Sequence, residues 1–101
     1  MEEEAVTVPI NGVLDLHTFL PRELGELVPA YLTACREQGI YEVRIIHGKG
    51  TGSLRRSVYA ILSRLDCVES YRLAGDESGG WGATIVQLKR DGGQLFPVTG
   101  N

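Results

Sequence analysis

The chain has 101 residues, 43% of them hydrophobic, which is enough for one core and too few for two ordinary domains. No apolar stretch reaches the ~20 residues of a membrane span, and the N-terminal MEEE lacks the basic and apolar blocks of a secretory signal, so we expect a cytoplasmic protein with no membrane partner. The formal net charge of −3 argues against a domain that relies on a general basic excess to bind nucleic acid.

The first predicted elements are a strand and a helix. Residues 13–17 (VLDLH) are rich in strand-forming types, and we expect them to form the first core strand. Residues 5–10 (AVTVPI), separated from it by Asn11-Gly12, could pair with it as a hairpin or form an arm that leads into it. Between residues 21 and 38, apolar side chains recur every three or four positions and predict a helix that Gly39 ends. The expected buried face of this helix consists of Leu24, Leu27, Val28, Tyr31, Leu32 and Cys35.

Pro29 interrupts the helical pattern. A proline ring clashes with the carbonyl four residues earlier and donates no amide hydrogen bond. Either Gly25 eases a kink at that point, or residues 21–27 form a separate turn and the main helix begins near Pro29.

The second half of the chain predicts one more helix and three more strands. Residues 41–46 (YEVRII) form a β-branched run with Val43 and Ile45 on one face, and residues 68–74 and 83–89 also have strand patterns. The helix between them buries Leu54, Val58, Ile61, Leu62 and Leu65. The order is therefore β-α-β-α-β-β, an α/β (α+β) two-layer sandwich with the helices over a sheet.

Polar residues cluster where the first two strands end. A strand–helix–strand connection makes its two strands parallel, so both end at one edge of the sheet. Asp15 and His17 project from one face of the first strand, and His47 ends the second. Ligands bind at this edge in open α/β sheets, so we expect the two histidines to lie close together.

The segment HGKGTG at residues 47–52 has the composition of an anion-binding loop. Its glycines permit positive φ angles and close approach to a ligand, Lys49 adds charge, and Thr51 or Ser53 could cap the helix that follows. Arg55 and Arg56 come directly afterwards, whereas the three N-terminal glutamates account for the net negative charge. The spacing matches neither GxxxxGK[ST] nor GxGxxG, so an ATP or NAD site is not indicated.

Three segments together resemble the sequence blocks of the Smr (small MutS-related) domain family: LDLH, HGKGTG and GGWGATIVQL. The resemblance covers residues 12–90 and leaves residues 1–11 as an N-terminal arm and residues 91–101 as an irregular tail. It implies a four-stranded mixed sheet with two helices, similar to the C-terminal domain of translation initiation factor 3. Smr domains occur at the C-terminus of some MutS-family proteins and as free-standing proteins, and we expect a free-standing member.

The resemblance also implies a function and a set of site residues. Several members nick or cut DNA and others cleave RNA, which implies an endonuclease, a hydrolase of phosphodiester bonds. The family's Asp-x-His element falls on Asp15 and His17, and its HGxG element on His47, Gly48 and Gly50. This chain departs from the family pattern at Thr18, where many members have glycine, and at Trp81, where small residues are common.

For each candidate residue a functional interpretation stands beside a structural one. His17 could transfer a proton with Asp15 fixing its tautomer, or Asp15 could cap the following helix while His17 bonds a loop carbonyl. His47 could be a general acid, a phosphate ligand or a satisfied residue at a strand end. The predicted nucleic-acid or phosphate contacts, each of which could instead be solvated or packed on the core, are Gly48, Lys49, Gly50, Thr51, Gly52, Arg55 and Trp81.

Two functions of different class follow. The first is an endonuclease on branched or nicked DNA or on RNA, and the alternative is a non-catalytic DNA- or RNA-binding module that uses the same loop. A ribosome-binding role rests on fold analogy alone. Asp15, His17 and His47 could offer three metal ligands, but no spacing demands a divalent ion, so we expect no required cofactor. The sequence fixes no oligomeric state.

Overall fold

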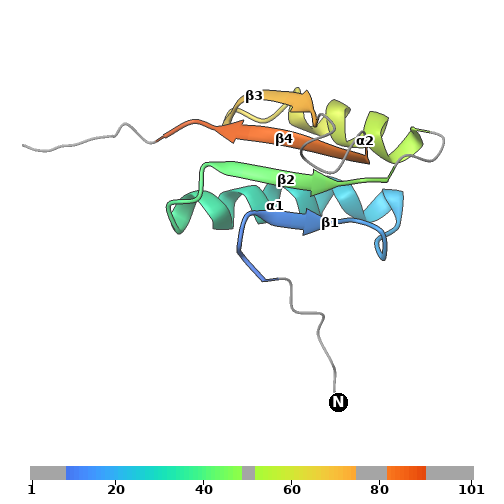
Figure 1. Cartoon of the computed structure of the whole chain (residues 1–101), viewed down its shortest axis with the longest axis horizontal. Coiled ribbons are helices and arrows are strands. Elements are labelled where there is room, and N and C mark those ends of the chain that lie inside the picture. Colours follow the sequence, from blue (N-terminus) through green and yellow to red (C-terminus); the bar gives the residue numbers. More distant parts are fainter. Residues whose placement is uncertain (1–8, 49–51, 75–81, 91–101) are drawn as a thin grey trace, which may run out of the picture.

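The computed structural model describes residues 9–48, 52–74 and 82–90, and these residues form two layers (Figure 1). The elements are β1 (Val13–Asp15), the 3₁₀ turn η1 (Pro21–Glu23), α1 (Leu24–Glu37), β2 (Glu42–Ile46), α2 (Ser53–Leu62), β3 (Val68–Leu73) and β4 (Ala83–Leu88). This order confirms the expected β-α-β-α-β-β architecture. The expected arm and tail lie almost entirely outside the described residues. No helix in the described ranges is long and apolar enough to cross a membrane.

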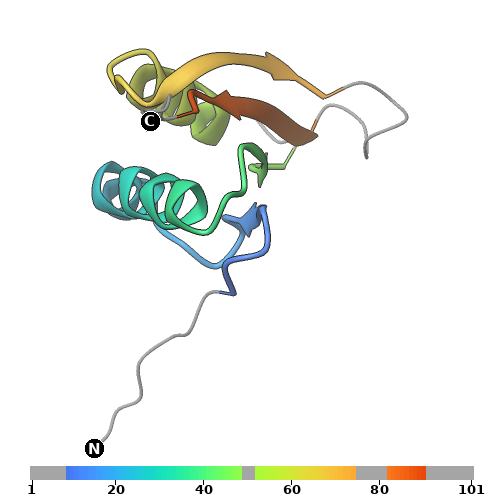
Figure 2. The same cartoon turned by 90° about the vertical axis from the view of Figure 1, so that its left-hand side faces the viewer.

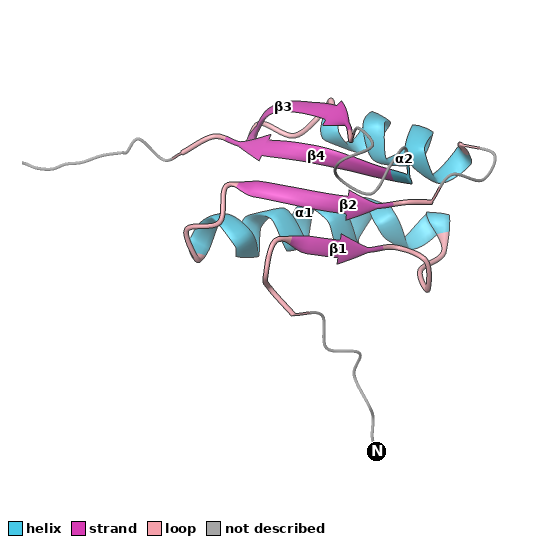
Figure 3. Cartoon of the chain, in the orientation of Figure 1, coloured by secondary structure: helices cyan, strands magenta, loops and turns pink. Residues whose placement is uncertain are grey.

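The sheet is mixed and has the strand order β1-β2-β4-β3. β1 and β2 are parallel, and β4 is antiparallel to both of its neighbours, so β1, β2 and β3 all run in the same direction. The connections through α1 and α2 cross the sheet in the same sense, which places both helices on one face (Figures 2 and 3). The carboxyl ends of β1, β2 and β3 therefore share an edge with the start of β4.

The core lies between the sheet and the two helices. Alternate residues of the strands point toward the helices, and these positions are completely buried, as Leu14, Val43, Ile45 and Val86 show. The helices contribute the residues that the sequence predicted for α1, with Leu27 only half-buried, together with Val58, Ile61 and Leu62 of α2. On the opposite face of the sheet no helix of the described ranges is packed, although Ala74, Ala83 and Ile85 on that face are buried as well.

Helix α1 continues through Pro29, so the alternative in which the main helix begins there is wrong. Gly25, the residue whose carbonyl a proline at position 29 crowds, has space beside its Cα, since an added Cβ there would meet no atom within 4 Å. The predicted stop at Gly39 is confirmed: this glycine has φ +79°, and Ile40 N–H donates to the Cys35 carbonyl at 2.8 Å.

The outer edge of β1 is closed by the Tyr31 hydroxyl. This buried group accepts a hydrogen bond from Gly12 N–H at 3.2 Å and lies 3.0 Å from the Val13 carbonyl oxygen, to which it can donate. The outward Val13 N–H donates to Asn11 Oδ1 at 3.0 Å. An open strand edge can pair with another chain, and these side-chain contacts occupy the outward backbone N–H and C=O of Val13, which such pairing would use.

Substitution of Tyr31 by phenylalanine tests this arrangement. The change leaves the buried Gly12 N–H without its acceptor, so we expect the free energy of unfolding to fall by about 1–3 kcal/mol. Urea unfolding measures it. Tyr59→Phe is the matched control, because within the described part of the chain the Tyr59 hydroxyl makes no hydrogen bond. Equal stability of the two variants would contradict the role given to Tyr31.

Candidate functional site

Asp15 and His17 form a solvent-exposed pair at the carboxyl end of β1. One carboxylate oxygen, Asp15 Oδ1, accepts the backbone N–H of His17 at 3.0 Å and lies 2.9 Å from the Nδ1 atom of its ring. An ionised carboxylate can only accept, so Nδ1 carries the hydrogen, and the other ring nitrogen, Nε2, is left available to a substrate. The His17 side chain is 76% exposed, so the ring is accessible.

Two hydrogen bonds keep Asp15 ionised. The backbone N–H of His17, and after it the His17 ring, hold the pKa of this carboxyl below its usual value. The carboxylate therefore remains the acceptor that orients the imidazole. At the start of η1, it is Glu23 Oε1 that accepts a hydrogen bond from a backbone N–H, that of Leu20, at 2.7 Å. Asp15 therefore does not cap the helix that follows β1.

His47 lies directly after β2 in a different environment. It is only 6% exposed, its Nε2 lies 2.8 Å from Thr84 Oγ1, and its Nδ1 lies 3.0 Å from the Gly48 carbonyl oxygen. A carbonyl can only accept, so Nδ1 carries the hydrogen, and in the neutral ring Nε2 accepts from the Thr84 hydroxyl. Both ring nitrogens are therefore engaged inside the protein.

The backbone around His47 is also anchored. The N–H groups of His47 and Gly48 both donate to the Gly82 carbonyl, at 2.8 and 2.9 Å. Together with the bond to Thr84, these contacts tie the start of the glycine loop to the start of β4. Sequence reasoning missed Thr84. The sequence did contain a signal for Thr84: it is a hydroxyl residue on the same face of β4 as the core residues Val86 and Leu88, two and four positions later.

The two histidines belong to the same sheet edge but to different faces. Asp15 is in register with Ile46 on the helix-free face, whereas His47 continues the alternation of Val43 and Ile45 toward the helices. Only the His17 ring is open to solvent. Direct action of His47 on a substrate stays a prediction, and its hydrogen bonds are those of a residue that positions the glycine loop.

The glycine loop is described at its two ends. Gly48 and Gly52 have the expected positive φ angles of +82° and +86°. Gly52 is the N-cap residue of α2, so the expectation that Ser53 would cap this helix is wrong; Ser53 is already its first residue. The predicted contacts Lys49, Gly50 and Thr51, and also Trp81, lie outside the described residues.

Two guanidinium groups gather at the N-terminus of α2. Nitrogen atoms of Arg55 and Arg56 come within 3.3 and 3.5 Å of the point where Gly52 would carry a Cβ. The first turn of α2 contains no acidic residue. Cations at a helix N-terminus oppose the dipole, so this end of α2 is strongly electropositive and favours an anion.

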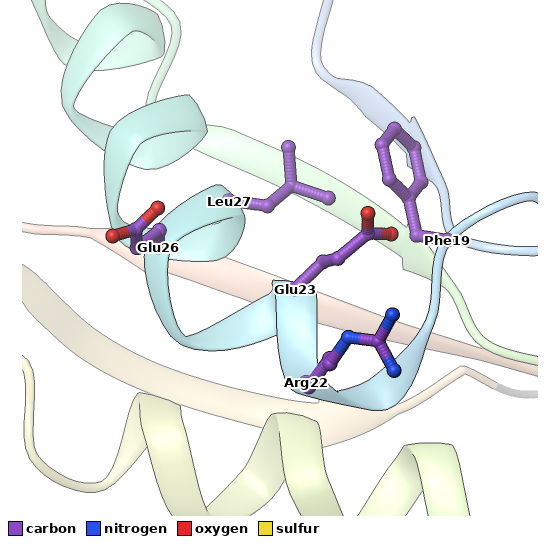
Figure 4. Close-up of a pocket in the computed structure, with 5 residues that line it drawn as sticks. All are labelled: Phe19, Arg22, Glu23, Glu26 and Leu27. Atoms are coloured by element: carbon purple, nitrogen blue, oxygen red, sulfur yellow. The ribbon is translucent and has the colours of Figure 1, made fainter.

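A groove of about 440 Å³ beside η1 and the start of α1 has the opposite character (Figure 4). Phe19 and Leu27 supply apolar walls, and Glu23 and Glu26 supply carboxylates, with Arg22 as the single cation. This surface disfavours phosphate. Within the described ranges, no group of three His, Cys, Asp or Glu side chains is arranged to hold a metal ion.

Replacement of Thr84 by valine tests the buried contact to His47. Valine has nearly the same shape but cannot donate, so the buried His47 Nε2 loses its partner, and we expect a loss of about 1–3 kcal/mol in the free energy of unfolding. Thr84→Ser, which keeps the hydroxyl, should be the more stable of the two variants. A valine variant as stable as wild type would show that the hydrogen bond contributes nothing.

The hydrogen bonds to Asp15 predict that the free energy of unfolding depends on pH. Because its folded-state pKa is lowered, the ionised carboxylate stabilises the fold above the unfolded pKa of about 4, and this contribution disappears as pH falls through the folded value. Wild type should exceed Asp15→Asn in unfolding free energy near neutral pH, and the difference should shrink in acid. Glu69→Gln controls for the loss of an exposed charge. A difference that does not change with pH would contradict the assignment.

Comparison with known proteins identifies the family. The Smr domain model matches residues 14–89. The endonuclease MutS2 of Halothermothrix orenii is 51% identical over 80 residues, which are 79% of this chain and 10% of that protein. The endonuclease MutS2 of Thermomicrobium roseum is 44% identical over 84 residues, 82% of this chain and 11% of that protein. The chain thus spans about a tenth of the length of these relatives.

Solved structures agree with the sequence comparison. The crystal structure of the Smr domain of Thermus thermophilus MutS2 superposes with a TM-score of 0.73 at 35% identity and covers 78% of this chain and 99% of that one. YdaL, a stand-alone small MutS-related protein from Escherichia coli, superposes with a TM-score of 0.69 at 30% identity and covers 78% of this chain and 65% of that one. The resemblance expected from the three sequence blocks is confirmed, and the chain belongs to the Smr domain family.

Proposed function

We propose that this Smr domain cleaves a phosphodiester bond of DNA or RNA, with His17 as the general base. The observation that carries the proposal is the exposed Asp15–His17 pair, in which a carboxylate fixes one ring nitrogen and leaves the other open. The names of the MutS2 relatives, which are endonucleases, support the same reaction class.

The proposed chemistry is proton transfer coupled to attack on phosphorus. His17 Nε2 takes a proton from water, or from a ribose 2′-hydroxyl in RNA, and the resulting oxygen nucleophile forms a bond to phosphorus. The opposite P–O bond breaks, and the leaving oxygen takes a proton from solvent. Asp15 holds the imidazole in its tautomer and stabilises the imidazolium that forms, the part an aspartate plays in other histidine-centred sites.

Charge on the pentacovalent phosphorus is stabilised by the electropositive end of α2. The Arg55 and Arg56 guanidinium groups and the dipole of α2, equivalent to about half a charge, supply this field. Lys49 and the amides from Gly48 to Gly52 are further proposed contacts, and Trp81 is a proposed contact to a base. No step requires a metal ion.

We propose that His47 acts on the substrate indirectly, by positioning the glycine loop. Its ring is buried and bonded to Thr84 and Gly48, so it acts by holding the first residue of the glycine loop in place. This role predicts that loss of the ring weakens phosphate binding, whereas loss of His17 affects the chemical step.

The alternative function is a nucleic-acid-binding module without catalysis. One observation favours it: the edge offers only one solvent-open imidazole, so no second histidine is exposed to protonate the leaving group. Both functions use the same electropositive surface, and cleavage assays separate them.

The decisive test compares wild type with His17→Ala on supercoiled plasmid and on structured RNA, with and without chelator. We expect the variant to keep its affinity and to lose cleavage by about 10²- to 10⁴-fold, the usual contribution of a general base. Thr18→Ala, at the neighbouring exposed position, is the matched control and should cleave like wild type. A wild-type protein that binds these substrates but never cleaves them would establish the binding module, and activity abolished by chelator would refute the metal-free mechanism.

A further inference from the structure

We propose that the outer flank of α1 is a docking surface for a basic amphipathic helix of a partner protein. The outer flank is defined by six residues along one side of the helix and the turn before it, namely Glu23, Glu26, Leu27, Ala30, Ala34 and Glu37. This interaction is separate from the proposed cleavage of nucleic acid and does not depend on it.

The spacing of these residues places them beside the buried face of α1. An α-helix turns by about 100° per residue, so Leu27, Ala30 and Ala34 lie within about 60° of one another, and the three glutamates fall on the same side. On the opposite flank, Arg36 Nε donates to the Lys89 carbonyl, just beyond β4, at 3.1 Å. The outer flank is therefore the side of α1 turned away from β4.

Apolar surface is open at the start of this flank. Leu27 and Phe19 supply the apolar walls of the groove of about 440 Å³ (Figure 4). Leu20, the next residue after Phe19, is 46% exposed, and among the described residues only Val13 is another large hydrophobic side chain with such exposure. Apolar surface rimmed by polar groups is typical of interaction sites. The groove therefore offers a place for one apolar side chain of a partner.

The middle of the flank favours a helix as the occupant. Ala30 is exposed and Ala34 is partly exposed, and they are four residues apart, so their small side chains let a second helix lie close to α1. Alanine is also a good helix former, and it is the groove next to these alanines that indicates a partner. A helix with apolar residues three and four apart rests on Ala30 and Ala34 and inserts one side chain beside Leu27.

The charge of the flank defines the charge of the partner. Glu23, Glu26 and Glu37 are all exposed, and Arg22 is the one cation that lines the groove. Within the described ranges, neither Glu26 nor Glu37 forms an ion pair. Lysine or arginine side chains on the partner helix pair with these carboxylates, whereas a nucleic acid is repelled by them.

A second copy of this chain is a poor occupant. The cationic helix of the described chain is α2, with Arg55 and Arg56 in its first turn. Contact between α2 of one copy and α1 of the next is head-to-tail, and such contacts build an open chain of copies unless the rotation closes a ring. The contact would also cover the electropositive end of α2. The partner is therefore a different protein.

The test uses a labelled synthetic helical peptide with leucines three and four residues apart and lysines elsewhere, and its binding is measured by fluorescence anisotropy. A second peptide has glutamate in place of every lysine. Wild type should bind the lysine peptide and not the glutamate peptide. Glu26→Lys should weaken binding about fivefold, because one exposed attraction becomes a repulsion. Glu69→Lys, at an exposed position of β3, changes the net charge equally and should bind like wild type.

A second pair of variants tests the close approach of the helix. Ala30→Gln keeps a good helix former but adds a longer, uncharged side chain on the flank, and it should weaken binding by a similar factor. Ala60→Gln, at an exposed alanine of α2, is the matched control and should bind like wild type. Thermal unfolding verifies that all four variants remain folded.

Three results would overturn the docking surface. The first is equal weakening by Glu26→Lys and Glu69→Lys, which would show attraction to net charge alone. The second is a wild type that does not bind the lysine peptide, whatever the cleavage assays show. The third comes from sedimentation equilibrium: if wild type self-associates and Glu26→Lys does not, the flank belongs to a second copy and not to a different protein.

Discussion

The parallel pairing of β1 with β2 is the constraint on which the site depends. Because the chain returns through α1, both strands end at the same edge, and the register places Asp15 beside Ile46. One residue of slip would turn Asp15 toward the core and expose Leu14, which the burial of apolar surface forbids. The energetics of the core thus fix which face of the sheet carries the catalytic candidate.

The alternation of side chains between the two faces of the sheet also explains why His17 is exposed and His47 is buried. His17 lies beyond a strand of three residues, where the chain turns and the ring is free to bond Asp15 in solvent. His47 extends β2 by one residue on its inward face, where burial is tolerable because both nitrogens have partners. His47 is thus held by the fold through both ring nitrogens, whereas only His17 presents a nitrogen to solvent.

Periodicity in the sequence was sufficient for the element order and for most of the core, because apolar side chains recur at helix and strand spacings. It could not decide the conformation at Pro29, because a proline within a helical pattern can either end the helix or be accommodated inside it, as it is in α1. Motif spacing located Asp15, His17 and His47 but could not decide which histidine would be exposed and which buried. Their different exposure depends on Thr84, 37 residues after His47, and such a long-range hydrogen bond leaves no local pattern.

A chain with net charge −3 can still bind a polyanion, because affinity depends on where the charges lie. In this domain, carboxylates of the described part line the groove beside α1, whereas guanidinium groups occupy the start of α2. Exposed charges separated by more than about 10 Å are largely screened at physiological salt. Each surface therefore attracts or repels an anion nearly independently of the net charge of the chain. A polyanion would be repelled from the acidic groove and attracted to the start of α2, a difference between two surfaces that a uniformly basic domain would lack.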